Sequence, residues 1–285
     1  MVTPMLNNPD GWTVLAALLG LLVGSFINVV VWRLPRMIKR DWQTQAAAIL
    51  GQSHPSHAPL SLMQPGSHCP TCATPLRWQD LLPLLSFAWL RGRCAHGGCA
   101  ISWRYPMVEL AVAAFWGVSV ARFGIGLEAL AWAGFATVLL ALSLIDLDTM
   151  LLPDVLTQPL LWTGLLASAL GLTGVQLTDS VWGAAAGYGV LWLVQALFGL
   201  VTGKQGMGEG DFKLLAALGA WLGWLALPML VLLSSLLGVF VALVMRWRGQ
   251  LKPGQALPFG PYLALSGVIT AAFAPMLVFN HRYIF

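Results

Sequence analysis

The stretch Gly206-Met207-Gly208-Glu209-Gly210-Asp211-Phe212-Lys213 interrupts sequence that is otherwise suited to lipid. The residues before it, Val181–Val201, and those after it, Leu214–Leu233, are almost wholly apolar. Charged groups at the edge of a bilayer are costly, and where they occur they usually serve a function and face a bundle interior or water. We therefore expect this stretch to belong to a functional site at one membrane face.

A second acidic cluster lies between two other apolar segments. Leu144-Ile145-Asp146-Leu147-Asp148 ends one segment, and Leu152-Pro153-Asp154 begins the next. Capping and the helix dipole favour an aspartate at a helix N-terminus, which accounts for Asp154 and in part for Asp211. The dipole disfavours Asp146, which falls at a helix C-terminus. We predict that the fold brings Asp146 and Asp211 together.

Such a pair has defined chemical uses. Two carboxyl groups held close together cannot easily both ionise, so one keeps a proton and the pair offers an acid and a base at once. Aspartic proteases use this arrangement: the base activates a water molecule and the acid protonates the departing group. The alternative is a proton or cation path in a transporter, which predicts acids near mid-membrane and inverted repeats. The acids lie instead at segment ends, and the sequence has no evident repeat.

The composition defines the class of protein. Of 285 residues, 58% are hydrophobic and only 9% are charged. Soluble domains carry about 25% charged residues, so a soluble globular domain is excluded. A bilayer is crossed by helices of roughly 20 residues, and we predict an all-α polytopic membrane protein.

The apolar segments predict about eight transmembrane helices. They are Trp12–Trp32, Met107–Val120, Leu127–Ile145, Leu152–Leu172, Val181–Val201, Phe212–Ala226, Pro228–Met245 and Pro261–Phe279. The first is interpreted as a retained helix and not a signal peptide, because no small-residue cleavage site follows Gly20. Small residues gather at 183–187 and 215–220, which predicts close helix packing there. The predicted division is a first helix (1–35), a polar cytoplasmic subdomain (36–105) and a seven-helix membrane domain (106–285).

The basic residues predict the orientation. With the N-terminus outside and eight spans, Arg122 and Arg282 fall outside, and all other Lys and Arg residues fall on the cytoplasmic side. That asymmetry satisfies the positive-inside rule. The cytoplasmic set is Arg33, Arg36, Lys39, Arg40, Arg77, Arg91, Arg93, Arg104, Lys204, Lys213, Arg246, Arg248 and Lys252. The same topology puts Asp146 and Asp211 at the cytoplasmic face.

The chain resembles the type IV prepilin peptidase family of membrane aspartyl proteases. The stretch 206–213 is similar to that family's Gly-x-Gly-Asp-x-Lys motif, and Gly24–Pro35 to its N-terminal signature. Arg104–Glu109 resembles the entry to the family's second helix, and Asp146–Asp154 its first catalytic segment. The resemblance runs in order from about Gly24 to Pro261.

The resemblance implies a bifunctional enzyme of the bacterial inner membrane. It would cut the basic leader from type 4 prepilins or type II secretion pseudopilins after a glycine, and then methylate the new N-terminal residue with S-adenosylmethionine. The implied partners are these substrates and the lipid bilayer, with no nucleic acid. Carried over by position, the catalytic acids are Asp146 and Asp211, with Asp148 a rival for the first role. The supporting residues are Asp148, Gly208, Gly210 and Lys213. Gly210 gives the backbone freedom to break the helix and let another chain approach. Lys213 could anchor at the interface or hold a nearby negative charge.

The four cysteines predict a structural zinc site. Cys69-Pro-Thr-Cys72 is followed by Cys94-Ala-His-Gly-Gly-Cys99, and two close pairs in a small subdomain suit tetrahedral zinc. The family commonly has two Cys-x-x-Cys pairs, whereas here Gly97 stands where the fourth cysteine is expected. Either Cys99 or His96 therefore completes the site. A disulfide is disfavoured in a cytoplasmic loop. A zinc-organised scaffold without chemistry is a further alternative, but it leaves the acid pair unexplained.

The methyl-transfer site has weaker sequence signals. No Gly-x-Gly-x-x-Gly follows a strand, so a Rossmann-type cofactor site is not supported. The polar residues Asn28, Arg33 and Glu109 lie near predicted membrane boundaries and are candidates for binding S-adenosylmethionine or the new amine. Structural salt bridging is the alternative role for them.

Overall fold

The computed structural model describes residues 9–52, 60–69, 71–203, 206–251 and 257–281, and it forms two compact units, residues 1–137 and 138–285. Throughout these described ranges the regular secondary structure is helical, and only two isolated β-bridges occur, His68 with Pro75 and Arg93 with Ala100. The all-α prediction is therefore confirmed.

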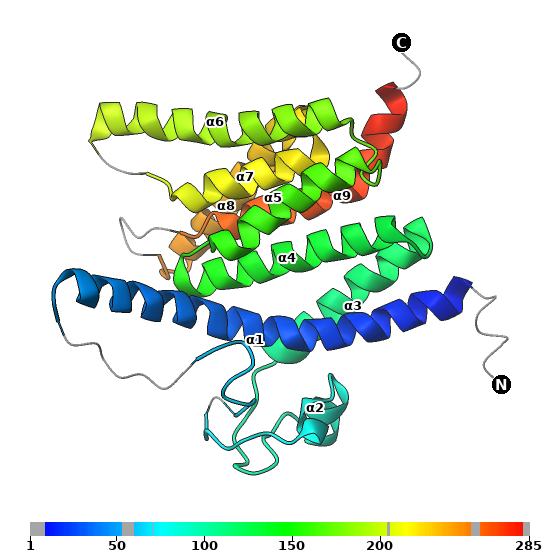
Figure 1. Cartoon of the computed structure of the whole chain (residues 1–285), viewed down its shortest axis with the longest axis vertical. Helices are drawn as coiled ribbons and strands as arrows, with labels where there is room; N and C mark the ends of the chain where they lie inside the picture. The colour runs from blue at the N-terminus through cyan, green and yellow to red at the C-terminus, as the bar shows by residue number, and fades with distance from the viewer. Residues whose placement is uncertain (1–8, 53–59, 70, 204–205, 252–256, 282–285) are drawn as a thin grey trace. The chain divides into compact units, whose positions relative to one another are not determined.

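The first unit is built on a long helix, α1 (Pro9–Ile49), packed against α3 (Arg104–Phe123). Between them in the sequence lie the short helices η1 (Trp78–Leu81) and α2 (Leu85–Trp89), and Figure 1 shows α2 below α1. A Cβ atom on Gly24 would lie 2.7 Å from the Cα atom of Glu109, so this glycine lets α1 and α3 approach closely. The close approach brings Asn28 and Arg33 in the middle of α1 to the same cavity as Glu109 near the start of α3.

The helix α1 extends beyond the predicted first span, Trp12–Trp32. It continues through Pro35 to Ile49 and crosses the boundary predicted at residue 35. Residues 36–49 are rich in Lys, Arg, Gln and Ala, which are strong helix formers. Their local propensity therefore continues the helix into the polar segment. The three-part division of the chain stays a prediction.

The second unit surrounds one short buried helix, α7 (Glu209–Leu222). Every residue from Asp211 to Leu222 is buried except Lys213, and a helix that is apolar all round is typically central. Figure 1 shows α7 between α5 and α6. The unit contains the end of α4 (Leu127–Thr149), then α5 (Asp154–Ala169), α6 (Leu177–Thr202), α7, η2 (Trp224–Ala226), α8 (Leu227–Trp247) and α9 (Gly260–His281).

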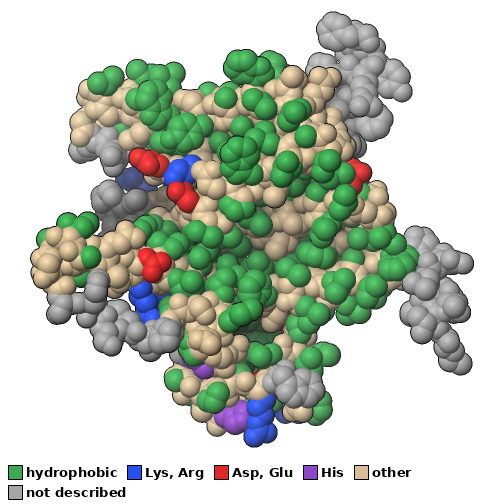
Figure 2. Space-filling model, in the orientation of Figure 1, with side chains coloured by type: hydrophobic (Ala, Val, Ile, Leu, Met, Phe, Trp, Pro, Cys, Tyr) green, Lys and Arg blue, Asp and Glu red, His purple; other side chains and the backbone are tan. Residues whose placement is uncertain are grey.

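The helices have the composition of a membrane protein. Each predicted apolar segment is helical, and among the described residues five helices are long and apolar enough to cross a membrane: α1, α3, α4, α6 and the stretch of η2 with α8. The helices α5 and α7 are shorter, at 16 and 14 residues. Many large apolar side chains are exposed, and Figure 2 shows them spread over the visible face with few charges between them. Such surfaces suit contact with lipid.

The predicted small-residue packing occurs between α6 and α7. A Cβ atom on Gly183 would lie 2.2 Å from the carbonyl oxygen of Gly219, and one on Gly219 would lie 2.1 Å from that of Gly183. The two backbones are therefore in direct contact. Side chains cannot relieve an overlap of this kind, because the obstructing atoms are main-chain atoms.

We expect Gly183→Ala to destabilise the fold by about 1–3 kcal/mol, the usual range for overpacking. Gly189→Ala is a matched control on the same helix, because a Cβ atom there has no neighbour within 4 Å. Thermal unfolding of both variants in detergent measures the difference. Equal melting temperatures for the two variants would contradict the close contact.

Candidate functional site

The second unit brings two buried carboxyl groups together. Asp146 lies near the end of α4, and Asp211 lies in the first turn of α7. Their exposed fractions are only 5% and 8%, whereas Asp148 and Asp154 are exposed. The two buried carboxyl groups are close enough to repel each other electrostatically. Burial thus distinguishes Asp146 from Asp148, which the sequence left as the alternative first catalytic acid.

Asp146 is held by the last helix of the unit. The backbone N–H of Gly260 donates a hydrogen bond of 3.0 Å to the Asp146 Oδ2 atom, in a buried position. Gly260 begins α9, and the first N–H groups of a helix lack partners within the helix and favour negative charge. The N-terminus of α9 therefore offsets the unfavourable place of Asp146 at the end of α4.

Sequence analysis did not identify Gly260. Its signal is the run Pro258-Phe259-Gly260-Pro261, where a glycine between prolines opens the last apolar segment. A Cβ atom on Gly260 would lie 2.7 Å from the Asp146 Oδ2 atom, so a side chain there would displace the carboxyl group. The glycine is thus required for the hydrogen bond.

Leu152 packs between the two acid-bearing regions. A Cβ atom on Gly210 would lie 2.7 Å from the Cβ atom of Leu152, and one on Gly260 would lie 3.1 Å from a Leu152 methyl group. Gly210 therefore leaves room for Leu152 next to Asp211, and the approach of another chain at this glycine stays a prediction. Gly208 has extended backbone angles and precedes the first residue of α7. The glycines fit the predicted supporting role by leaving space and by starting the helix.

Lys213 pairs with Asp154. Its Nζ atom lies 2.8 Å from both carboxylate oxygens of Asp154, and the two side chains are 24% and 60% exposed. An exposed pair of this kind contributes about 0–1 kcal/mol to stability. Of its two predicted roles, the structure gives Lys213 that of holding a nearby negative charge, which links α7 to the start of α5.

Gln195 on α6 fixes the stretch that precedes α7. Its side-chain oxygen accepts hydrogen bonds from the backbone N–H groups of Gly206 at 3.1 Å and Met207 at 3.0 Å. Sequence analysis missed this residue. The available signal is a lone amide within the apolar run Val181–Val201.

The four cysteines of the first unit form one cluster. The sulfur atoms of Cys69, Cys72, Cys94 and Cys99 all lie within 4.8 Å of one another. The Sγ atoms of Cys69 and Cys99 are 3.3 Å apart, and those of Cys72 and Cys94 are 3.8 Å apart. Tetrahedral zinc with Zn–S bonds near 2.3 Å requires sulfur separations of about 3.8 Å. The donor set and its spacing therefore fit a closed structural zinc site.

The unusual spacing of the second cysteine pair has a local explanation. A Cβ atom on Gly97 would lie 2.7 Å from the Cys72 sulfur, so the longer loop passes this ligand only because residue 97 is glycine. His96 is exposed and lies outside the cluster, whereas Cys99 completes it. The hydrogen bond with the Thr74 hydroxyl lowers the pKa of Cys72 to about 6. This favours the thiolate, which is the form that binds metal.

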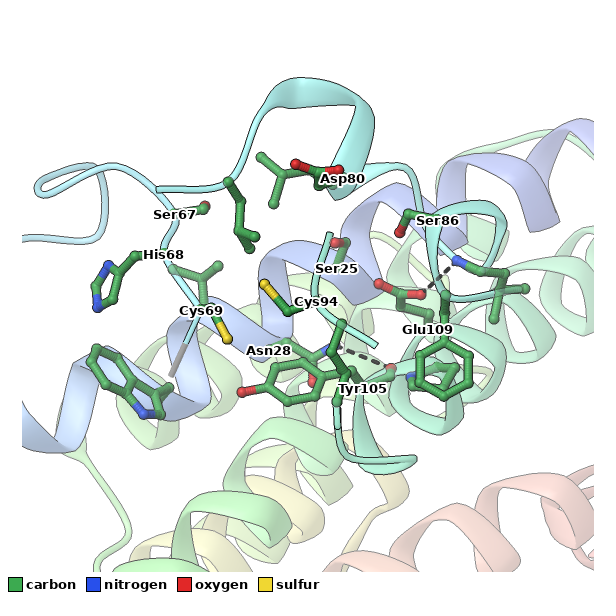
Figure 3. Close-up of a pocket in the computed structure, with 18 of the residues that line it drawn as sticks. Ser25, Asn28, Ser67, His68, Cys69, Asp80, Ser86, Cys94, Tyr105 and Glu109 are labelled. Atoms are coloured by element: carbon green, nitrogen blue, oxygen red, sulfur yellow. Dashed lines mark hydrogen bonds between the residues drawn. The ribbon is translucent and has the colours of Figure 1, made fainter. Parts of the chain in front are cut away.

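The three candidates for cofactor binding line a single cavity of the first unit, shown in Figure 3. Arg33 is 4% exposed and donates hydrogen bonds of 3.1–3.3 Å to backbone carbonyls of the loop 61–66. Asn28 donates to the Tyr105 carbonyl at 3.2 Å. Glu109 accepts a hydrogen bond of 2.9 Å from the Leu84 N–H. Backbone groups form hydrogen bonds with all three residues, and among the described residues no salt bridge with Arg33 or Glu109 is found.

The second unit is a helical membrane fold that holds two carboxyl groups in one buried place, and the first carries a cysteine cluster suited to metal. Family models match both parts of the chain. The model of the bacterial peptidase A24 N-terminal domain matches residues 18–123, and that of the type IV leader peptidase family matches residues 133–243. The chain belongs to the type IV leader peptidase family.

Curated relatives agree over nearly the whole length. A prepilin leader peptidase/N-methyltransferase of Stutzerimonas stutzeri is 48% identical over 262 residues, covering 92% of this chain and 90% of the relative. The protein of the same name from Aeromonas hydrophila is 51% identical over 261 residues, covering 90% and 88%. No solved structure matches the chain. These matches favour a peptidase with methyltransferase activity over the transporter alternative.

Proposed function

We propose that this chain removes the leader peptide from a prepilin-type substrate with Asp146 and Asp211, and then methylates the new N-terminus. The observation that carries the peptidase assignment is the burial of these two carboxyl groups side by side in the second unit. Membership of the leader peptidase family supports the same reaction. The substrates are prepilins, type II secretion pseudopilins or both.

Peptide cleavage follows from a carboxyl pair that shares one proton. The ionised carboxylate takes a proton from water while the water oxygen attacks the scissile carbonyl carbon. The protonated carboxyl then gives its proton to the departing amide nitrogen, and the C–N bond breaks. The Gly260 N–H favours the ionised form of Asp146, because it donates to the carboxylate. We therefore assign Asp146 as the base and Asp211 as the acid in the first step.

The methylation needs a methyl donor, and S-adenosylmethionine supplies a methyl carbon on a positively charged sulfur. When bound, the donor would supply this methyl carbon to the deprotonated amine, and Asn28, Arg33 and Glu109 are the candidates to hold the donor. Zinc held by Cys69, Cys72, Cys94 and Cys99 is assigned a structural role, because four protein ligands leave no open coordination position.

We place the chain in the bacterial inner membrane with its N-terminus on the periplasmic side. The distribution of Lys and Arg supports this orientation. Lys204, Lys252 and Arg282 contribute to that count and lie outside the described residues. In this orientation the acid pair opens toward the cytoplasmic face, where the basic leader of a membrane-inserted substrate would lie.

The function is tested by incubating the purified chain with a prepilin and S-adenosylmethionine, and measuring the product masses. We expect loss of the leader at a glycine and addition of one methyl group to the new N-terminus. Without the methyl donor, cleavage should proceed and the methyl group should be absent. An uncut prepilin in both reactions would contradict the peptidase assignment.

A further inference from the structure

The cavity of the first unit has the features of a small-molecule binding site. It lies between α1, the start of α3 and the cysteine-containing segment, and Figure 3 shows side chains from all three directed toward it. Its apolar walls include Trp32, Leu84, Phe87 and Ile101. Ligand sites in proteins are typically concave and apolar with a few placed polar groups.

Most polar groups on the lining of this cavity are neutral, and among its charged groups acids outnumber Lys and Arg. Asp80 and Glu109 supply two carboxyl groups, and Arg33 is the one Lys or Arg among the described lining residues. The Arg33 guanidinium already donates to three loop carbonyls. Cys69 and Cys94 also line the cavity, and zinc held by four thiolates carries a net charge of about −2. The electrostatic environment therefore favours a cationic ligand.

Glu109 is the most informative of these groups. It is 8% exposed, and in the described part of the chain no Lys or Arg pairs with it. The Leu84 N–H and the Ser25 hydroxyl donate to its carboxylate. A buried acid is stabilised as an anion by an opposite charge nearby, and the described residues supply hydrogen bonds to Glu109 but no Lys or Arg partner. A bound cation would complete the site.

We propose that this cavity is the S-adenosylmethionine site, with Glu109 as the counter-charge for the cationic donor and Asp80 as a second acidic contact. The inference rests on the proposed methyltransferase function. Trp32, Phe87 and Tyr105 line the cavity and provide apolar contacts for the adenine base. Arg33 and Asn28 are then positioning residues, because their hydrogen bonds hold the loop 61–66 and the start of α3 that form the walls.

The charge argument predicts a preference between donor and product. S-Adenosylmethionine carries a positive charge on sulfur, whereas S-adenosylhomocysteine, left after methyl transfer, has a neutral sulfur. An acidic cavity should therefore bind the donor more tightly than the product, and the product should leave readily. Replacing Glu109 should reduce this preference.

The test is calorimetric titration of the full-length, zinc-loaded chain with each of the two compounds. Glu109→Gln keeps an oxygen that can accept from the Leu84 N–H but removes the charge, and should weaken donor binding by about tenfold or more. Binding of S-adenosylhomocysteine should change less. Glu128→Gln makes the same change at the start of α4, away from the cavity lining, and should leave both affinities unchanged.

Zinc content and melting temperature are measured on each variant, and Asp80→Asn provides a second variant should Glu109→Gln fail to fold. Unchanged donor affinity in the folded acid variants would overturn the inference. So would equal loss of donor and product binding, because that would indicate a distorted cavity and no charge recognition. Prepilin cleavage by a wild-type chain that binds neither compound would overturn the methyltransferase proposal together with this inference, and would leave the peptidase proposal intact. Donor binding that the acid variants do not change would overturn the inference alone.

Discussion

Asp211→Asn is expected to slow prepilin cleavage by at least about 10³-fold, within the range associated with loss of a catalytic acid or base. Asparagine has nearly the same shape as aspartate, so the first turn of α7 and its packing should be preserved. The amide cannot donate the proton that the departing nitrogen requires. Single-turnover cleavage followed by mass spectrometry measures the effect.

Asp179→Asn is the matched control. Asp179 lies in the first turn of α6 in the same unit, and its carboxylate accepts a hydrogen bond from the Trp224 indole N–H. If Asp211 served only to stabilise a helix N-terminus, both variants would lose about 0.3–1 kcal/mol of stability and both would still cleave. Retained cleavage by folded Asp211→Asn would therefore reduce this acid to a structural role.

Cys99→Ala is expected to lose the bound zinc, whereas His96→Ala should retain it. Structural zinc sites bind with apparent free energies of about 10–16 kcal/mol, so loss of one of four ligands should have a large effect on the metal and on the folded cysteine segment. The structure places the Cys99 sulfur in the cluster and leaves His96 exposed outside it. Metal analysis after dialysis gives the number of zinc ions per chain.

The opposite pattern, with zinc retained by Cys99→Ala and lost by His96→Ala, would show that histidine is the fourth ligand. Gly66→Ala serves as a control for changes in the same polar segment, because a Cβ atom there has no neighbour within 4 Å. It should bind zinc as the wild-type chain does.

Local sequence patterns were sufficient to predict the helices and to single out Asp146 and Asp211. The length of the apolar segments identifies the helices. Charged residues next to these segments are easily recognised, because only 9% of the chain is charged. What holds Asp146 could not be predicted, because the Gly260 N–H reaches it across 114 positions of sequence. Every residue except proline carries a backbone N–H group, so the sequence does not show which of them donates to Asp146. The role of Leu152 could not be predicted either. The sequence contains many leucines, and nothing in it shows that Gly210 and Gly260 leave space for this one.

The candidate residues of the cavity illustrate a second limit. Arg33 and Asn28 were selected because polar groups near a membrane boundary invite a functional interpretation. The structure shows that their donors are bonded to backbone carbonyls of Ser61, Leu62, Gly66 and Tyr105. Those acceptors exist at every residue, so sequence alone cannot pair them. The extension of α1 to Ile49 was not predicted, because the apolar segment ends at Trp32 and the polar residues after it were assigned to a separate subdomain.

The central claim is that the buried Asp146, and not the exposed Asp148 two residues later, is the partner of Asp211. The most direct measurement compares prepilin cleavage by Asp146→Asn and Asp148→Asn, with folding and zinc content matched to the wild-type chain. We predict that Asp146→Asn loses cleavage by about 10³-fold or more, whereas Asp148→Asn retains most of it. Cleavage by Asp146→Asn together with its loss in Asp148→Asn would contradict the account and move the first catalytic acid to the exposed position.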